Sequence, residues 1–159
     1  MEKAVTNTSS IIFIGKLDLF NLAKNTFSEI LIPKQVLEEL FKKDSPENNL
    51  IKKYLQDFLT ETEITKIKDL PLDIGESAAI SLCLEKNINI LISDDKKARS
   101  YARNLGIETI GVIGIILDNL QKDKIKKSEA KELLNKLIKK GYYISSAVYS
   151  EILKNIERY

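Results

Sequence analysis

The chain reads INILISDDKKARSYARN over residues 88–104. Four of the first five residues are apolar, and this compact run predicts a buried β-strand. Asp94 and Asp95 follow at once, and a helix is predicted to begin at one of them and to run to Asn104. The stretch is therefore a strand-helix unit with acidic residues at its turn, which is typical of α/β proteins.

Outward from this unit, hydrophobic periodicity predicts strands and helices in alternation. Further strands are predicted at residues 3–6, 29–32, 62–67 and 107–112. Helices are predicted at 11–14, from residue 16 onward, and at 34–43, 50–58, 73–85, 113–120, 128–140 and 145–156. This order predicts a three-layer α/β fold, with a central, mostly parallel sheet of about four to five strands flanked by helices. Sites in such sheets form beyond the carboxyl ends of the strands.

The length of 159 residues fits one domain, and 43% hydrophobic against 30% charged residues is a globular balance. We expect a single domain over residues 1–159, in which residues 128–159 form a C-terminal helical extension packed on the rest. An apolar stripe in this extension either covers the core or pairs with a second subunit. The stripe consists of Ile144, Val148, Ile152 and Ile156.

The residue types present exclude several kinds of active site. The chain has no histidine, which removes imidazole metal sites, Ser-His-Asp triads and histidine general bases. The formal net charge of +2 is too small to indicate nucleic-acid binding by itself. A single cysteine, Cys83, cannot form an internal disulfide, and no signal peptide or membrane-length apolar run is present. We therefore expect a cytoplasmic protein without membrane contact.

Polar and acidic residues recur where a predicted strand meets a helix, or where a helix faces that edge of the sheet. They are Asn7 with Ser9, Glu39, the turn from Asp73 to Glu76, and the pair Asp94-Asp95. Carboxylates gathered without basic partners repel one another, and the usual remedies are protonation or a hard divalent cation with oxygen ligands. Magnesium is the first candidate.

Each of these positions also has a structural interpretation. Asp73 and Glu76 have the spacing of a capping box, and Asp94 or Asp95 suits the N-cap of a helix. Glu39 lies beside Glu38 on a predicted helix, where a glutamate is normally solvated. Ser9 and Asn7 suit a helix cap and a turn. Taken singly, the positions do not require chemistry.

Taken together, and in this order along the chain, they resemble the PIN domain family, in particular its VapC-type branch and the PIN-like group called DUF3368. The strongest matches are LDIGESAAI at 72–80 and ILISDDKKAR at 90–99. Weaker ones are VTNTSSII at 5–12, GKLDL at 15–19, Ile32-Pro33 with Val36 and Glu39-Leu40, and Gly106-Ile107. The sequence GYYIS at 141–145 extends the likeness through most of the chain.

The resemblance implies a metal-dependent endoribonuclease of the VapC toxin type, hydrolysing RNA, and less readily DNA, to a 5′-phosphate. Its catalytic acids would be Glu39, Glu76, Asp94 and Asp95. Mg²⁺ or Mn²⁺ would be held by Asn7 together with Glu39, Glu76 and Asp94, and Ser9 would position the attacking water. An antitoxin protein and a second copy of the chain are the partners that it implies.

Asn7 departs from the family pattern, because most PIN nucleases have their first aspartate there. An asparagine removes one formal negative charge, which weakens metal binding or leaves room for one ion instead of two. The competing hypothesis is therefore a catalytically weak or inactive module that binds nucleic acid or an antitoxin. A receiver-like phosphoryl-transfer site fits poorly, because the acidic doublet follows a late strand.

Four cationic residues follow the acidic turn on one predicted helix: Lys96, Lys97, Arg99 and Arg103. We expect them to receive the phosphate backbone of a nucleic acid. The alternative is a solvated helix face. Arg99 is favoured among the four, because the resemblance includes the Ala98-Arg99 pair.

Overall fold

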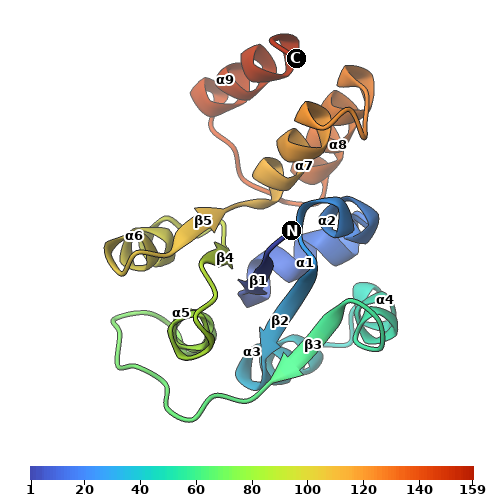
Figure 1. Ribbon diagram of the computed structural model, residues 1–159. Helices are drawn as coiled ribbons and strands as arrows, with labels where there is room; N and C mark the ends of the chain where they lie inside the picture. Colours follow the sequence, from blue (N-terminus) through green and yellow to red (C-terminus); the bar gives the residue numbers. More distant parts are fainter.

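A five-stranded parallel sheet forms the centre of the computed structural model, which describes residues 1–159 (Figure 1). The strands are β1 (Lys3–Thr6), β2 (Glu29–Pro33), β3 (Leu59–Thr62), β4 (Ile90–Ile92) and β5 (Glu108–Ile110). Their order is β3-β2-β1-β4-β5, and every neighbouring pair is parallel. The chain builds outward from β1 to one side and then to the other, so the switch point lies between β1 and β4. The expected fold class is confirmed.

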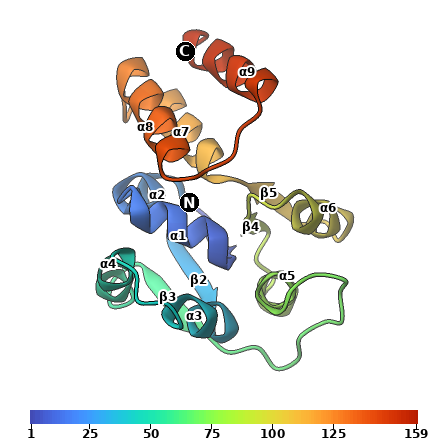
Figure 2. The same ribbon diagram turned by 180° about the vertical axis from the view of Figure 1, so that it is seen from behind.

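Nine helices flank this sheet, with several of them starting at polar caps that the sequence supplies (Figure 2). Asn7, Asp73, Asp95 and Ser145 each accept a hydrogen bond from a first-turn backbone N–H. The helices are α1 (Thr8–Lys16), α2 (Phe20–Thr26), α3 (Lys34–Phe41), α4 (Glu47–Tyr54), α5 (Ile74–Lys86), α6 (Lys96–Asn104), α7 (Val112–Gln121), α8 (Lys127–Lys139) and α9 (Ser146–Glu157).

The two faces of the sheet carry separate apolar cores. Along β2, Ile30 and Ile32 point into the larger core, whereas Leu31 between them points into the smaller one. β4 divides in the same way, with Ile92 on one side and Leu91 on the other. This period of two is why the strands read as continuous apolar runs: both of their faces are buried.

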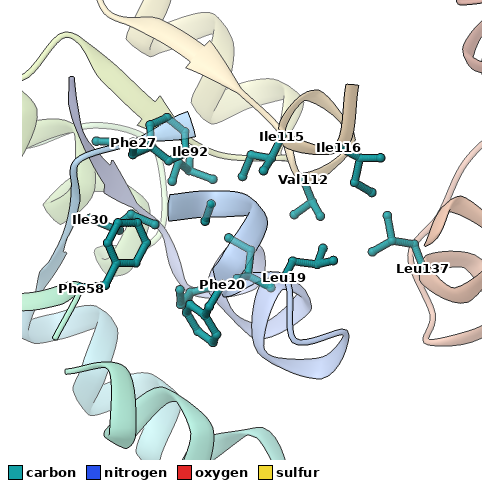
Figure 3. Close-up of a cluster of buried hydrophobic side chains, with 14 of the residues drawn as sticks. Leu19, Phe20, Phe27, Ile30, Phe58, Ile92, Val112, Ile115, Ile116 and Leu137 are labelled. Atoms are coloured by element: carbon teal, nitrogen blue, oxygen red, sulfur yellow. The ribbon is translucent and has the colours of Figure 1, made fainter. Parts of the chain in front are cut away.

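Helix α5 covers the smaller core, and it contacts β1, β2 and β4. Most other helices, including α8 and α9, bury side chains in the larger core. Figure 3 shows this core, with Leu137 of α8 facing the side of α7 that carries Val112 and Ile116. Ile152 and Ile156 of the apolar stripe are buried in the same core, while Val148 is 50% exposed. Two of the four stripe residues therefore cover the core fully.

The bounds of three predicted elements differ clearly from the structure. β3 lies at Leu59–Thr62 rather than at 62–67, because Leu59 is buried and pairs in register with Ile30 of β2. The preceding helix α4 ends at Tyr54, four residues before the predicted end. The second helix begins at Phe20 instead of residue 16, since Asp18 takes a left-handed φ of 50° that ends the first helix. No helix is long and apolar enough to cross a membrane.

Candidate active site

Asn7 lies directly after β1, at the switch point between β1 and β4, and it is only 2% exposed. Its Oδ1 accepts a hydrogen bond from the backbone N–H of Ser10, and its Nδ2 donates to Oγ of Ser93. The two bonds measure 3.1 and 3.0 Å. Asn7 therefore caps α1, the structural role that the sequence had suggested for Ser9, and one lone pair of Oδ1 remains beside the acids.

Asp94 uses both of its carboxylate oxygens in hydrogen bonds. Its Oδ2 accepts from Oγ of Ser10 at 2.7 Å, and its Oδ1 accepts from the backbone N–H of Val112 at 3.1 Å. Oδ1 also accepts from the hydroxyl of Tyr142 at 2.5 Å. Asp94 thus joins the end of β4 to the first turns of α1 and α7 and to the segment after α8. These bonds position the acidic turn, and they compete with any further ligand for the same oxygens.

A glycine makes the contact between Asp94 and α7 possible. A Cβ at Gly111 would lie 2.4 Å from Oδ1 of Asp94 and 3.2 Å from Nη1 of Arg99. Arg99 in turn donates from Nη1 to the backbone oxygen of Ser93 at 3.4 Å. Its guanidinium therefore lies against the inner side of the turn. The pKa of the neighbouring Tyr142 hydroxyl is raised by burial, by the charge of Asp94 and by their hydrogen bond, and Arg99 opposes this rise.

Three other carboxylates act on Glu76 at the start of α5. Burial, followed by the negative charges of Asp73, Asp95 and Glu39, raises the pKa of Glu76 from its ordinary value of 4.5 to about 7. A backbone hydrogen-bond interaction from Asp73 to the Glu76 carboxylate opposes the shift. Asp95 caps α6 through Oδ2, and Glu39 accepts from the hydroxyl of Thr8 at 3.0 Å. The acids that affect Glu76 are thus on α3, α5 and α6.

The capping-box spacing of this pair is reflected in the structure. Asp73 caps α5 by accepting from the backbone N–H of Glu76 at 2.8 Å, and the backbone of Asp73 in turn acts on the Glu76 carboxylate. Gly75 lies between them, and a Cβ there would sit 2.9 Å from Oε2 of Glu39. The small residue lets Glu39 of α3 approach the first turn of α5. Glu76 is left facing the other acids.

Two adjacent pockets meet at this place. The smaller, of about 220 Å³, is lined by Asn7, Glu39, Asp73 and Glu76 among others. The larger, of about 620 Å³, is lined by Glu76, Asp94 and Asp95 on the acidic side. Ser9 is exposed and, like Glu76, lines both pockets. All the acids predicted from the sequence therefore border one continuous stretch of surface, with Glu76 between the two halves.

The donor set suits a divalent cation in an open site. The oxygens are hard carboxylate donors, and none of the ion pairs in the structure involves these acids. No three Asp, Glu or Cys side chains converge closely enough to hold an ion by themselves. Magnesium is usually bound by one or two carboxylates together with waters and substrate phosphates. The residues fit such a site and do not form a closed protein cage.

The four predicted cations differ in whether they reach the acidic pockets. Lys96 lines the larger pocket, while Lys97 is exposed on the outer side of α6. Arg99 faces inward, as described. Arg103 donates from Nε to Oγ1 of Thr109 at 3.2 Å and lines a separate depression near β5. Lys96 is the one cation of the four that lines the acidic pockets.

The fold and this acidic edge define a PIN domain. The chain belongs to the DUF3368 family, described as a PIN domain, whose model matches residues 3–158. The expected family is confirmed, and with it the nuclease type of fold. No curated protein matches the chain by sequence.

Solved structures of low sequence identity share the fold. One is a PilT N-terminus domain protein from the hyperthermophilic archaeon Sulfolobus solfataricus P2, with a TM-score of 0.56 and 19% identity over 90% of this chain and 99% of that one. Another is the PIN domain endonuclease Utp24, with a TM-score of 0.55 and 15% identity over 69% of this chain and 84% of that one. A domain of a functionally unknown protein from Methanocaldococcus jannaschii DSM 2661 has a TM-score of 0.50 and 17% identity, covering 70% and 91%.

Proposed function

We propose that the chain is a metal-dependent endoribonuclease that hydrolyses RNA phosphodiester bonds at the acidic edge of its sheet. The observation that carries this proposal is the set of acids around Glu76. Their negative charges contribute to raising the pKa of Glu76 to about 7, and no cation of the chain pairs with them. A site that gathers unneutralised acids beside an open pocket is suited to bind a cation and a phosphate together.

The proposed ligands of Mg²⁺ or Mn²⁺ are Glu39 and Glu76, with Asp95 next to them and Asn7 contributing its carbonyl oxygen. The ion would lower the pKa of a water molecule and neutralise charge on the phosphodiester. Glu39 and Glu76 line the same small pocket, so their separation is set by the packing of α3 against α5. Ser9 borders both pockets, which supports its proposed role of hydrogen-bonding the attacking water.

Asp94 has a different proposed role from the other acids. Three donors already satisfy its oxygens, so it acts first as a positioning residue that holds α1 and α7 at the ends of β1 and β4. The lone pair of Oδ2 that is not used in these bonds would be available to help hold the metal ion. Lys96 is the proposed phosphate contact, followed by the exposed Lys97. Arg99 and Arg103 would stabilise the position of α6, through their hydrogen bonds to Ser93 and Thr109.

The wider biological setting is also part of this proposal. A VapC-type toxin would act in the cytoplasm, form a homodimer and be held inactive by an antitoxin protein. The support is the family alone. Expression of the chain without a partner in a bacterial host would then arrest growth, and the Glu76→Gln variant would not.

A second candidate function is a nucleic-acid-binding or antitoxin-binding module that no longer cuts. Asn7 favours it, because an amide stands where most PIN nucleases carry a carboxylate, and because both polar atoms of Asn7 are used in hydrogen bonds. In this case the pockets would still receive a single strand of RNA. The loss would lie in the metal and in the activation of water.

One experiment distinguishes the two functions. The purified protein is incubated with single-stranded and structured RNA in manganese, beside Glu76→Gln, Asp94→Asn and Asn7→Asp. Manganese-dependent cutting that is lost in Glu76→Gln supports the nuclease. Absence of cutting by the natural protein, with cutting gained in Asn7→Asp, supports the binding module. The exposed residue Glu38 on the same helix as Glu39 provides the control variant, Glu38→Gln, which should cut like the natural protein.

A further inference from the structure

A third pocket lies at the opposite end of α1 from the acidic site, and the proposed hydrolysis does not use it. Its volume is about 390 Å³, and it lies between the end of α1, the start of α4 and the residue that follows α8. None of the acids that border the other two pockets lines it. Its lining residues are Gly15, Lys16, Pro46, Glu47, Leu50 and Lys140.

Glu47 is the unusual residue of this pocket. It is only 8% exposed, yet its carboxylate forms no hydrogen bond and no ion pair within the chain. Its neighbour Asn48 is equally buried, but Asn48 donates from Nδ2 to the backbone oxygen of Lys43 at 2.6 Å. The helix dipole favours an acid in the first turn of α4, but it does not require the acid to be buried. A buried charge without a partner costs free energy, and a ligand that donates to Glu47 would remove that cost.

The burial of Glu47 follows from the close packing of α1 on α4. Gly15 has no side chain, and a Cβ there would lie 3.1 Å from Cβ of Glu47 and 3.3 Å from Cδ1 of Ile51. The stem of Glu47 therefore packs against the backbone of α1, while the residue lines the pocket. The acid is held at the wall of the pocket by two packed helices.

Two lysines line the same pocket and stay separate from this acid. Neither Lys16 nor Lys140 forms an ion pair with Glu47 or with any other acid. Nζ of Lys16 lies over the ring of Phe13, 5.4 Å from its centroid, and this contact favours its position at the end of α1. The pocket thus offers two cationic donors and one anionic acceptor that do not neutralise one another. Two positive charges suit the dianion of a phosphate monoester.

The acceptor side of the pocket indicates what the phosphate is attached to. A carboxylate only accepts hydrogen bonds, so the group that faces Glu47 must carry donors. Guanine is the nucleobase that presents two adjacent N–H donors, N1–H and the 2-amino group, on one edge, and one carboxylate can accept from both. Leu50 and the ring of Pro46 offer apolar surface to the face of a base. The pocket volume lies within the roughly 300–1,000 Å³ usual for small-ligand sites.

We propose that this pocket binds a guanine nucleotide that ends in a phosphate monoester. Glu47 accepts from N1–H and from the 2-amino group of the base, and Lys16 and Lys140 receive the phosphate. The ligand is bound here and no covalent bond changes. The inference is independent of the proposed nuclease, because none of these residues belongs to the acidic site.

The test is isothermal titration calorimetry on the full chain in EDTA, with guanosine 5′-monophosphate as the ligand. Adenosine 5′-monophosphate lacks the two donors for Glu47, and guanosine lacks the phosphate for the lysines. We expect each of these two to bind weaker by roughly tenfold or more, because each loses hydrogen bonds to a charged group. Inosine 5′-monophosphate lacks only the 2-amino group, and it should fall between guanosine 5′-monophosphate and adenosine 5′-monophosphate.

Variants assign the binding to this pocket. Glu47→Gln should weaken binding of guanosine 5′-monophosphate by roughly tenfold and leave that of adenosine 5′-monophosphate unchanged. A general loss of structure would weaken both nucleotides, so this loss of selectivity reports on Glu47 itself. Lys16→Gln and Lys140→Gln should weaken both. The matched control is Lys139→Gln, an exposed neighbour of Lys140 that does not line the pocket, which should bind like the natural protein.

Three outcomes overturn the inference. The first is no binding of guanosine 5′-monophosphate by the natural protein at millimolar concentration. The second is equal affinity for the guanine and adenine nucleotides. The third is binding that Lys96→Gln weakens and Glu47→Gln does not, since this would put the nucleotide at the acidic pockets. The proposed nuclease fails separately, through absence of manganese-dependent cutting, while this titration contains no metal.

Discussion

The hydroxyl of Tyr142 donates a 2.5 Å hydrogen bond to Oδ1 of Asp94, across 48 residues of sequence. This bond ties the segment between α8 and α9 to the acidic turn after β4. The C-terminal part of the chain therefore supports the site directly, and does more than cover the apolar core.

Removal of this bond should destabilise the fold. We expect Tyr142→Phe to lower the free energy of unfolding by about 1–3 kcal/mol, because the acceptor is a charged, partly buried carboxylate. For a chain of this length the melting temperature would fall by roughly 2–10 °C. The matched control is Tyr149→Phe, whose hydroxyl donates to Asn135 at the surface. Equal losses in the two variants would contradict a special role for the buried bond.

Gly111 should tolerate no side chain while Asp94 is in place. Gly111→Ala puts a Cβ where Oδ1 of Asp94 now lies, so that the bonds from Val112 and Tyr142 break. We expect a loss of about 2–4 kcal/mol in chemical denaturation. In an Asp94→Ala background the same substitution should cost much less, and the double-mutant cycle measures this difference. Additive costs would show that the two residues do not interact.

Stability should depend on pH through Glu76. Its pKa is raised in the folded protein to about 7 from an ordinary value of 4.5, so folding favours the protonated form. The contribution of this group is fully present below about pH 4.5 and is lost as pH rises through 7. In metal-free buffer, Glu76→Gln should therefore melt above the natural protein at pH 8, and the difference should shrink toward pH 4.5. The same pH-dependent difference in the exposed variant Glu38→Gln would contradict this assignment.

Asn7→Asp should strengthen the response to metal. The new carboxylate adds one negative charge beside Glu39 and Glu76 and loses the Nδ2 donor that now bonds Ser93. We expect a lower melting temperature in EDTA and a larger rise on addition of Mn²⁺ than in the natural protein. Asn104→Asp, at the exposed end of α6, adds the same charge far from the pockets. An equal metal response in both variants would show that the charge acts nonspecifically.

The local patterns of the sequence predicted those parts of the fold that depend on neighbouring residues. The apolar run of β4, the acidic turn after it and the caps at Asp73 and Asp95 are each readable within a few residues. β3 was placed a few residues too late, because its position depends on pairing with β2, about thirty residues away. Periodicity carries no information about such a partner.

The candidate site, like the fold, could be predicted only where it depends on residues that are close in sequence. The family resemblance pointed to Glu39, Glu76 and the Asp94-Asp95 pair, and all of them border the two pockets. It did not separate the roles of the two aspartates, since the three donors to Asp94 come from α1, from α7 and from the segment after α8. Tyr142 was noted only as part of the likeness at 141–145, without a role at the site, and Gly111 was missed. A tyrosine pair and a glycine after a strand are common, and only the assembled fold brings them to a carboxylate.

The hydrogen bond between Tyr142 and Asp94 can form only late in the synthesis of the chain. A ribosome makes every acid of the site well before it reaches Tyr142, so a growing chain carries its full set of carboxylates while the turn after β4 still lacks that support. The site is braced only when α8 and the residues after it have emerged and folded back. A chain interrupted near residue 140 would keep all of its acids and none of this bracing, so the presence of the acidic residues does not by itself give their arrangement.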